Sequence, residues 1–449
     1  MRLFDTAQGR VVPLDPREEG VVSMYVCGPT VYGPPHLGHG RFSLVFDILR
    51  RYLEWSGFEV RYVSNITDID DKIINRAREE GRSTEEVVAQ YEQLWYRAMD
   101  AIGVKRPTHD PHATQYVERM LELIADLMGR GFAYETSDGV YFDPSGVPDY
   151  GLLARQSIDS LRAGARVETN EEKRSPIDFA LWKKAKPGEP SWPSPWGPGR
   201  PGWHTECVVM SLDLLGEGFD IHGGGQDLAF PHHENERAQA VAAGRVFAHH
   251  WVHNGFVEVG GEKMSKSLGN FTDLLDLVES TDPRSYRLLV LQSHYRSPVE
   301  VNKATTDAAA SALERLDAFA RRTAALPAVP PDPEAIEAFR RHMDDDLDTP
   351  AAVDLLFSLV RRGNQALDAG DREAGATAAA AVREICRAVG LDLHESVGEV
   401  PAELLELARQ RDDARARKDW AQADALREQI QARGFVVEDT PAGTQVRRS

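Results

Sequence analysis

The alternation of apolar and polar positions predicts a parallel α/β domain near the N-terminus. Residues 21–27 form a nearly continuous apolar run, which is typical of a strand buried on both faces. A helical pattern follows from about Arg41 to Ser56 and stops at Gly57, and residues 59–64 read as a second strand. Such a βαβ unit implies a doubly wound parallel sheet that binds ligands at the carboxyl ends of its strands.

Beyond this unit the pattern predicts an insertion and then a return to the sheet. Residues 113–200 read as a helix, short strands and a run rich in proline, glycine and tryptophan. The strand pattern resumes at 219–222 and is followed by glycines 223–225. Glycines there would let a ligand approach the backbone, but a plain tight turn explains them equally well.

The second half of the chain is predominantly helical. Residues 284–390 carry long helical patterns, interrupted by the proline-rich segment 326–333, and predict a helical bundle. Residues 402–432 predict one or two further helices, and residues 435–449 predict a short strand with a turn. The length of 449 residues fits about three domains.

Composition narrows the class of protein. An apolar fraction of 42% with 27% charged residues is typical of a soluble globular protein, and no apolar stretch is long enough to span a membrane. The first twenty residues lack the apolar core of a signal peptide, so we expect a cytoplasmic protein. Cys27, Cys207 and Cys386 are too few for a disulfide framework, which leaves metal-binding, catalytic or simply buried thiols; for Cys386, in a helical pattern, burial is the simplest reading.

The net charge of −19 argues against indiscriminate nucleic-acid binding, because local basic patches must overcome the repulsion of phosphates. Residues 401–449 differ from the rest, with nine Arg and Lys against nine Asp and Glu. This neutral end would repel RNA less, although an ordinary solvated surface has the same composition.

Two separated signatures indicate that ATP activates a carboxylate. Residues 36–39 read His-Leu-Gly-His, so His36 and His39 can both face a helix N-terminus where a phosphate would bind. Residues 263–267 read Lys-Met-Ser-Lys-Ser and supply Lys263 and Lys266 as mobile cations for a leaving pyrophosphate. A dinucleotide fingerprint is rejected because Ser43 replaces the third glycine, and no Walker lysine follows.

Two further clusters are chemically ambiguous. The acidic stretch 65–72 suggests a metal site, but a solvated loop between strand and helix is the simpler interpretation. His232 and Glu236 lie four residues apart on a helix that Pro231 would open, and Cys27 and Cys207 could complete a zinc site. Spacing alone favours buried cysteines and a surface His–Glu pair instead, and His204 or His233 could replace a ligand.

The chain closely resembles the class I cysteinyl-tRNA synthetases along its whole length. The resemblance rests on the motifs MYVCGPTVY, HLGH, GWHTEC, DIHGGGQD, FPHHENE and KMSKSLGN, and on EDTPAGT near the C-terminus, in collinear order. It implies an α/β fold: a Rossmann-type parallel-sheet catalytic domain with an insertion, an α-helical anticodon-binding bundle and a small C-terminal α+β domain. The implied boundaries are 1–112 and 203–262 for the two halves of the catalytic domain, 113–202 for the insertion, 263–290 for a stem-contact region, 291–398 for the bundle and 399–449 for the C-terminal domain.

The resemblance also implies ligands and site residues. It implies one zinc ion, Mg²⁺ with ATP, the substrates ATP, L-cysteine and tRNA-Cys, no membrane partner, and a monomer. The implied zinc ligands are Cys27, Cys207, His232 and Glu236. The catalytic residues would be His36, His39, Lys263 and Lys266; ATP would contact His36, Gly38, His39, Gly223, Gly224, Asp227 and Lys266, and cysteine would contact Cys27, Thr67, Trp203 and His222.

Two other functions fit parts of this pattern. A cysteine:amino-sugar ligase of the mycothiol-pathway type would share the catalytic core, but the long C-terminal half argues against an acceptor that is a small molecule. A non-catalytic RNA-binding paralogue would be expected to lack a signature histidine or lysine, and all are present. The sequence therefore predicts an enzyme that joins cysteine to tRNA.

Overall fold

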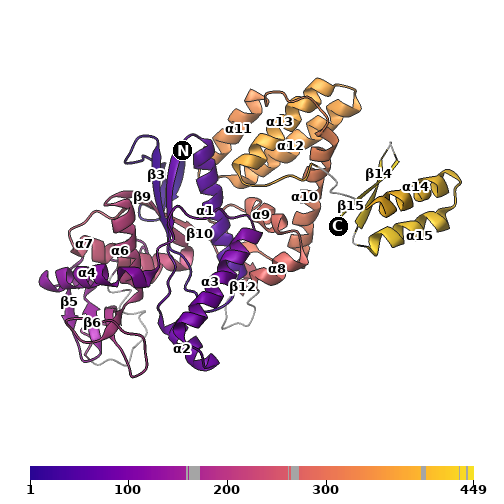
Figure 1. Ribbon diagram of the computed structural model, residues 1–449. Coiled ribbons are helices and arrows are strands. Elements are labelled where there is room, and N and C mark those ends of the chain that lie inside the picture. Colours follow the sequence, from indigo (N-terminus) through magenta and orange to yellow (C-terminus); the bar gives the residue numbers. More distant parts are fainter. Residues whose placement is uncertain are drawn as a thin grey trace. The chain divides into compact units, whose positions relative to one another are not determined.

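The computed structural model describes residues 1–157, 160, 172–260, 262–263, 273–395, 401–433, 435–440 and 443–448 (Figure 1). The chain divides into two compact units. The first comprises residues 1–313, 333–356 and 384–391, and the second comprises residues 314–332, 357–383 and 392–449. Each unit is described separately.

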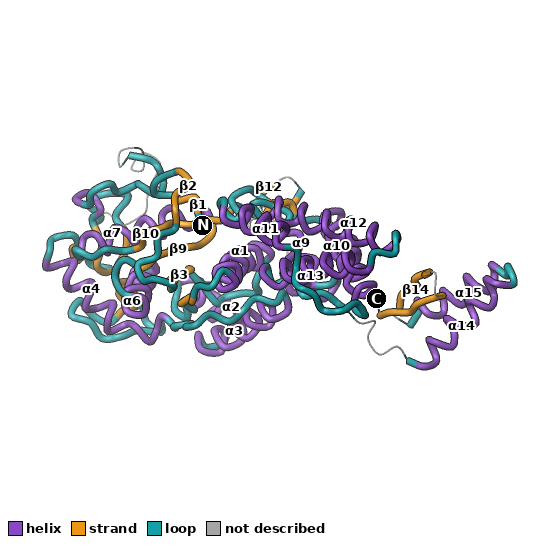
Figure 2. The backbone as a smooth tube through the Cα atoms, turned by 90° about the horizontal axis from the view of Figure 1, so that it is seen from above, coloured by secondary structure: helices purple, strands orange, loops and turns teal. Residues whose placement is uncertain are grey.

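The first unit is built on a four-stranded parallel sheet, as the sequence predicts. Its strand order is β10 (Ala248–Asn254), β9 (Phe219–Gly225), β3 (Val21–Val26) and β4 (Glu59–Ser64). Helix α1 (Leu37–Trp55) lies on one side of the strands, and α6 (Trp203–Leu215) and α7 (Glu234–Ala242) lie on the other (Figures 1 and 2). The chain runs from β3 to β4 in one direction and from β9 to β10 in the other. The strand order therefore reverses between β3 and β9, where such sheets bind ligands.

Helix α1 begins earlier than its pattern suggests, at Leu37 rather than near Arg41. Gly38 and Gly40 weaken the helical signal of the first turn, because glycine is a poor helix former. His36 caps the helix, and Gly40 is needed because a Cβ there would come within 2.9 Å of Leu274 and Tyr286 side chains. The first turn of α1 is thus set by capping and close packing rather than by periodicity.

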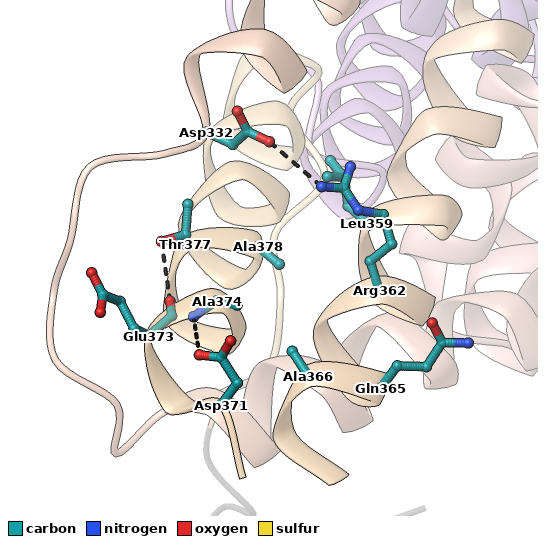
Figure 3. Close-up of a pocket in the computed structure, with 10 residues that line it drawn as sticks. All are labelled: Asp332, Leu359, Arg362, Gln365, Ala366, Asp371, Glu373, Ala374, Thr377 and Ala378. Atoms are coloured by element: carbon teal, nitrogen blue, oxygen red, sulfur yellow. Dashed lines mark hydrogen bonds and ion pairs between the residues drawn. The ribbon is translucent and has the colours of Figure 1, made fainter. Parts of the chain in front are cut away.

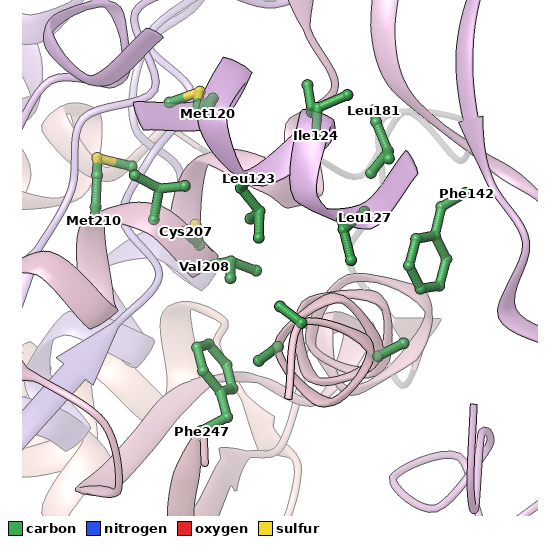
Figure 4. Packing of buried hydrophobic residues seen from close by; sticks show 14 of the residues in the cluster. Met120, Leu123, Ile124, Leu127, Phe142, Leu181, Cys207, Val208, Met210 and Phe247 are labelled. Carbon is green, nitrogen blue, oxygen red and sulfur yellow. The ribbon is translucent and has the colours of Figure 1, made fainter. Parts of the chain in front are cut away.

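The insertion carries its own antiparallel sheet with the order β5 (Ala133–Glu135), β6 (Gly139–Phe142), β7 (Phe179–Lys184) and β8 (Gly199–Pro201). Helix α4 (Val117–Gly129) packs between this sheet and α6 (Figure 4). The residues that meet there include Met120, Leu123, Ile124, Leu127, Phe142, Leu181, Val208, Met210 and Phe247, together with Cys207. This core fixes α6, and with it the position of Cys207.

Further elements belong to the first unit in whole or in part. They are β1 (Arg2–Asp5), β2 (Arg10–Pro13), α2 (Asp71–Glu80), α3 (Thr84–Ala101), η1 (Ala113–Tyr116), η2 (Pro144–Gly146), η3 (Gln226–Leu228), η4 (Ala229–His233), β11 (Val257–Val259), β12 (Glu262–Lys263), α8 (Leu274–Ser280), α9 (Pro283–Leu291), β13 (Val299–Glu300), α10 (Lys303–Thr323), α11 (Pro333–Asp344), α12 (Thr349–Asp368) and α13 (Arg372–Ala388). No helix of the described residues is both long enough and apolar enough to cross a membrane.

The second unit contains parts of α10, α12 and α13 and a small α+β module. The module consists of α14 (Ala402–Ala416), α15 (Trp420–Gln431) and the hairpin of β14 (Phe435–Thr440) and β15 (Gly443–Arg448), around a core of Leu404, Ala408, Ile430, Val437 and Val446. A cavity of about 660 Å³ lies between α12 and α13 (Figure 3). Its lining includes three carboxylates but only one cation, Arg362, which pairs with Asp332 at 3.8 Å, so it does not suit a phosphate.

A buried ion pair joins α1 to α9. Arg287 Nη1 donates to Asp47 Oδ2 at 2.6 Å, and both side chains are at most 2% exposed. Replacing Asp47 by alanine leaves the guanidinium buried without its carboxylate, and we expect the free energy of unfolding to fall by about 3–5 kcal/mol. Urea denaturation of Asp307→Ala, which breaks the exposed Lys303–Asp307 pair, is the control, with an expected loss below about 1 kcal/mol. Equal losses in the two variants would contradict this role.

Candidate active site

A cavity of about 270 Å³ opens at the carboxyl ends of β3, β9 and β10. It lies at the point where the strand order reverses. Seven residues singled out in the sequence line it: Cys27, His36, Gly38, His39, Trp203, Gly225 and Asp227. The fold therefore brings the first signature and one candidate zinc ligand into a single space.

The two signature histidines cap the helix on which they lie. His36 Nδ1 accepts the backbone N–H of His39 at 3.2 Å, and His39 Nδ1 accepts the backbone N–H of His36 at 3.3 Å. The rings stack with centroids 3.6 Å apart. Because both Nδ1 atoms are acceptors, each neutral ring carries its proton on Nε2. The N-terminus of α1 thus presents backbone N–H groups and two imidazoles together.

Only part of the second signature can be placed. The backbone of Lys263 lies in β12, antiparallel to β11, and Val257 at the start of β11 lines the cavity. Beyond the signature, the backbone N–H of Leu274 donates to the carbonyl of Pro35 at 2.9 Å, next to His36. Lys266 and the rest of residues 264–272 lie outside the described residues.

A buried cluster of sulfur, nitrogen and oxygen atoms lies behind the cavity. Cys27 Sγ lies 3.7 Å from Cys207 Sγ and 3.5 Å from Glu236 Oε1. His232 Nε2 lies 3.6 Å from Cys207 Sγ and 3.0 Å from Glu236 Oε1. All four side chains are buried, and their ligand atoms lie within 4.8 Å of one another, so they could hold one metal ion.

A second set of four residues shares two members of this cluster. Cys27, His222, His233 and Glu236 also bring their ligand atoms within 4.8 Å of one another. His222 Nε2 lies 3.1 Å from Glu236 Oε2, but among the described residues neither Glu236 Oε2 nor His233 Nε2 has a partner that meets hydrogen-bond geometry. Both sets combine cysteine, histidine and carboxylate, which zinc binds, so geometry alone leaves two candidates.

The electrostatics of the cluster favour negative charge on Glu236 and Cys207. Burial raises the pKa of Glu236, but His222 and His232 outweigh burial and lower it to about 2. Burial likewise raises the pKa of Cys207, but hydrogen bonds with Cys27 and His232 outweigh burial and lower it to about 6. Burial lowers the pKa of His233 far below its ordinary value, and neutral imidazole is the form that binds a metal, so this shift does not exclude the second set. Two anionic groups thus lie together without exposure to water, an arrangement that a divalent cation stabilises.

The surroundings of His232 agree with one expectation and explain one residue. Phe230 has extended backbone angles (φ −142°, ψ 134°), and the helical backbone that follows begins at Pro231 in η4 and continues into α7. Trp203 stacks on the His232 ring with centroids 4.0 Å apart and also lines the cavity. His204, an alternative ligand from the sequence, instead places its Nδ1 at 2.8 Å from His232 Nδ1.

Four of the predicted contact residues lie behind the wall of the cavity. Thr67 is buried, with its Oγ1 at 3.2 Å from Glu206 Oε2, and His222 is buried against Tyr25. Gly223 and Gly224 continue β9 rather than forming a turn. A Cβ at these two positions would come within 2.3 Å of Phe46 and 2.9 Å of His233, so packing explains both glycines.

The sequence missed other residues of the site. Asn65 was assigned to a solvated loop, which is wrong: it is buried, and its Oδ1 accepts the Gly28 N–H at 2.9 Å and the Tyr25 hydroxyl at 3.1 Å. In the same stretch, Asp68 accepts the Thr114 N–H at 2.9 Å. The cavity wall also contains Lys72, Asn254 and Phe256, whose positions no spacing in the sequence indicates.

Solved structures share this architecture. Mycobacterium tuberculosis methionyl-tRNA synthetase in complex with methionyl-adenylate matches with a TM-score of 0.62 at 16% identity, covering 83% of this chain and 90% of that chain. A leucyl-tRNA synthetase from Agrobacterium radiobacter K84 matches with a TM-score of 0.61 at 13% identity, covering 84% of each chain. The parallel sheet with its inserted antiparallel sheet and helical C-terminal region is the fold of a class I aminoacyl-tRNA synthetase.

Comparison of sequences defines the family more narrowly. Residues 13–311 match the family model of the class I (C) tRNA synthetase catalytic domain, residues 338–394 a DALR domain, and residues 397–447 the cysteinyl-tRNA ligase anticodon binding domain. The cysteine–tRNA ligase of Halorhodospira halophila is 47% identical with full coverage of both chains, and that of Streptomyces griseus is 44% identical, covering 99% of this chain and 98% of its own. The chain belongs to the cysteinyl-tRNA synthetases and is a cysteine–tRNA ligase.

Proposed function

We propose that the cavity of about 270 Å³ binds ATP and cysteine, and that cysteinyl-adenylate forms there before transfer to tRNA-Cys. The observation that carries this proposal is that Cys27 from the buried cluster and both signature histidines line the same cavity. The thiol end of a bound cysteine would lie toward the cluster, and its carboxylate would lie toward the N-terminus of α1. The carboxylate would then face the α-phosphate of ATP, as its attack on that phosphate requires.

His36 and His39 would act electrostatically on the phosphates. Their Nδ1 atoms accept the capping hydrogen bonds. The Nε2–H groups would therefore be the ones that donate hydrogen bonds to phosphate oxygens. Negative charge on the equatorial oxygens develops during attack, and donors fixed by the helix stabilise it without reorganising. Lys263 and Lys266, with Mg²⁺ bound to ATP, would neutralise the departing pyrophosphate.

The nucleoside would lie against β9 and β10. Asp227 lines the cavity just beyond the carboxyl end of β9, and a carboxylate there can accept both ribose hydroxyls. Gly225 lines the cavity beside it, whereas Gly223 and Gly224 are explained by packing. We therefore assign the ribose to Asp227 and the close approach of the nucleotide to Gly38 and Gly225.

Zinc would be held by Cys27, Cys207, His232 and Glu236. The donor set, its burial and the lowered pKa values of Cys207 and Glu236 fit a divalent cation. Bound there, zinc would favour the soft thiolate of cysteine over the hydroxyl of serine. Trp203 covers the outer face of His232 and would exclude water from this end of the cavity.

Recognition of tRNA is assigned mainly to the C-terminal half. The resemblance implied anticodon binding by the bundle 291–398, but the family model for residues 397–447 favours the small domain 399–449. Trp420, at the start of α15, is 58% exposed, an unusual position for a large aromatic ring. An exposed indole can stack on an unpaired anticodon base, and the neutral charge of residues 401–449 reduces repulsion.

We expect Trp420→Ala to lower kcat/KM for tRNA-Cys about tenfold, because stacking on one base is worth roughly 1–3 kcal/mol. Cysteine-dependent ATP–pyrophosphate exchange should not change, since it needs no anticodon. Leu405→Ala, which removes another exposed apolar side chain of the same domain, is the control and should leave both reactions unchanged. Equal charging by wild type and Trp420→Ala would refute the stacking contact.

Two assays test the proposed function as a whole. The protein should catalyse ATP–pyrophosphate exchange that depends on cysteine and should then charge tRNA-Cys. Exchange without charging of tRNA, but with transfer of cysteine to an amino sugar, would identify the alternative ligase instead. No disulfide joins the three cysteines, all of which the structure describes, and this supports the reducing cytoplasm as the location of this reaction.

A further inference from the structure

A second cavity, of about 500 Å³, lies directly beside the active-site cavity. The segment 225–230 separates the two: Gly225, Asp227 and Leu228 line the active-site cavity, whereas Gln226, Ala229 and Phe230 line the second one. We call the second cavity the arginine pocket, after Arg155 and Arg296 in its wall. The remaining lining residues are Phe4, Thr6, Leu153, Ala154, Gln156 and His253.

The arginine pocket is positively charged in a protein of net charge −19. None of the described residues that line it is acidic. The ring nitrogens of His253 lie 2.7 Å from Thr6 Oγ1 and 2.8 Å from His233 Nδ1. Arg155 therefore determines the net charge of the pocket, because Arg296 is paired with Asp346, and the amides of Gln156 and Gln226 add neutral hydrogen-bond donors.

Arg296 is held in place by a buried carboxylate. Its Nε and Nη2 donate to Asp346 Oδ2 at 2.9 and 2.6 Å, and its guanidinium lies 4.5 Å from the centroid of the Phe4 ring. Asp346 also accepts the backbone N–H of Phe4 at 2.7 Å. Nη1 of Arg296 has no hydrogen-bond partner within the described part of the chain, so this fixed group can still bind an anion.

Arg155 is the second cation, and its backbone is unusual. Its φ of +53° lies in the left-handed region that bulky residues rarely adopt. The neighbouring Leu153 N–H donates to Glu234 Oε2 at 2.6 Å, which ties this end of the insertion to α7. The guanidinium lies over Gly9 of the β1–β2 turn, and no carboxylate among the described residues pairs with it. An unpaired arginine held in strained backbone suggests a function in binding.

We propose that the arginine pocket binds a backbone phosphate of the single-stranded 3′ end of tRNA just before the terminal ribose enters the active-site cavity. The proposal rests on the proposed function, in which that ribose attacks the adenylate. Two guanidinium groups recognise phosphate, and aromatic rings such as Phe230 suit unpaired bases. The phosphates of ATP are expected at His36 and His39, on the other side of segment 225–230.

The test uses Arg155, because Arg296 also neutralises the buried Asp346. Full-length tRNA-Cys and the same tRNA lacking its terminal CCA are bound to wild type, Arg155→Ala and Arg155→Lys. Arg155→Gly, which suits a left-handed backbone, replaces the alanine variant if that one fails to fold. Arg10→Ala is the charge control, since Arg10 is an exposed cation on the β1–β2 hairpin outside the pocket.

We expect Arg155→Ala to raise the Kd for full-length tRNA about fivefold to twentyfold and to leave the Kd for truncated tRNA unchanged. Arg155→Lys should recover part of the loss, and Arg10→Ala should match wild type. An equal effect of Arg155→Ala on both tRNAs, or no effect on either, would overturn the proposal. ATP–pyrophosphate exchange should be unchanged in every variant. If wild type itself shows no exchange, that result refutes the proposed function and does not test the assignment of this pocket.

Discussion

Cysteine-dependent ATP–pyrophosphate exchange is expected to fall by about a thousandfold or more when Cys207 is replaced by serine. Cys207 lies on α6 with its Sγ 3.7 Å from Cys27 Sγ and 3.6 Å from His232 Nε2. The substitution removes one proposed zinc ligand and leaves Glu236 and His232 in a buried site without their partner. Steady-state kinetics should show the loss in kcat/KM for cysteine, while the KM for ATP changes little.

Cys386→Ser provides the matched control for this experiment. Cys386 is also a buried cysteine on a helix, in α13, and belongs to neither of the two candidate metal sets. Its replacement should lower stability modestly and leave kcat/KM for cysteine within about twofold of wild type. Full exchange activity in the Cys207→Ser variant would exclude Cys207 as a ligand needed for cysteine activation.

Replacing His36 by asparagine is expected to lower kcat for ATP–pyrophosphate exchange by about 100- to 1,000-fold. The imidazole is assigned to stabilise charge that develops on the α-phosphate, and loss of one such donor has this magnitude. Because the interaction strengthens in the transition state, kcat should fall more than the KM for ATP rises. Steady-state exchange assays at saturating cysteine measure kcat and the KM for ATP.

The asparagine variant separates catalysis from folding. His36 also caps α1, and asparagine is a good N-cap that can accept the same backbone N–H. His36→Asn should therefore unfold at nearly the same urea concentration as wild type, whereas His36→Ala should lose about 1 kcal/mol as well as activity. If His36→Asn keeps its activity and only His36→Ala is impaired, the histidine acts through capping alone.

The sequence predicted the framework of the fold well where the pattern is strong. Residues 59–64 form β4 as predicted, and residues 21–27 predicted β3 to within one residue. β3 is buried along its whole length, so its apolar run leaves little ambiguity, whereas β4 at the edge of the sheet is only partly buried. The sequence pattern placed the start of α1 too late, because Gly38 and Gly40 weaken the helical signal of a first turn that packing and capping stabilise.

Residues of the site could be predicted only where they belong to a recognisable sequence motif. His36, His39 and the cysteines stand in recognisable strings, but Asn65 does not, and its burial depends on hydrogen bonds to Gly28 and Tyr25 across the sheet. Trp203 could be named as a neighbour of the metal segment, yet its stacking on His232 requires α6 and η4 to meet. Such contacts between distant segments exist only in the folded chain.

The most direct test of zinc binding at this site is the zinc content of purified variants. Inductively coupled plasma mass spectrometry should find about one zinc per chain in wild type and almost none in Cys207→Ser and His232→Ala. His233→Ala, a change in the second candidate set, should retain the metal. Zinc that persists in Cys207→Ser and His232→Ala but disappears in His233→Ala would contradict the assignment of Cys27, Cys207, His232 and Glu236.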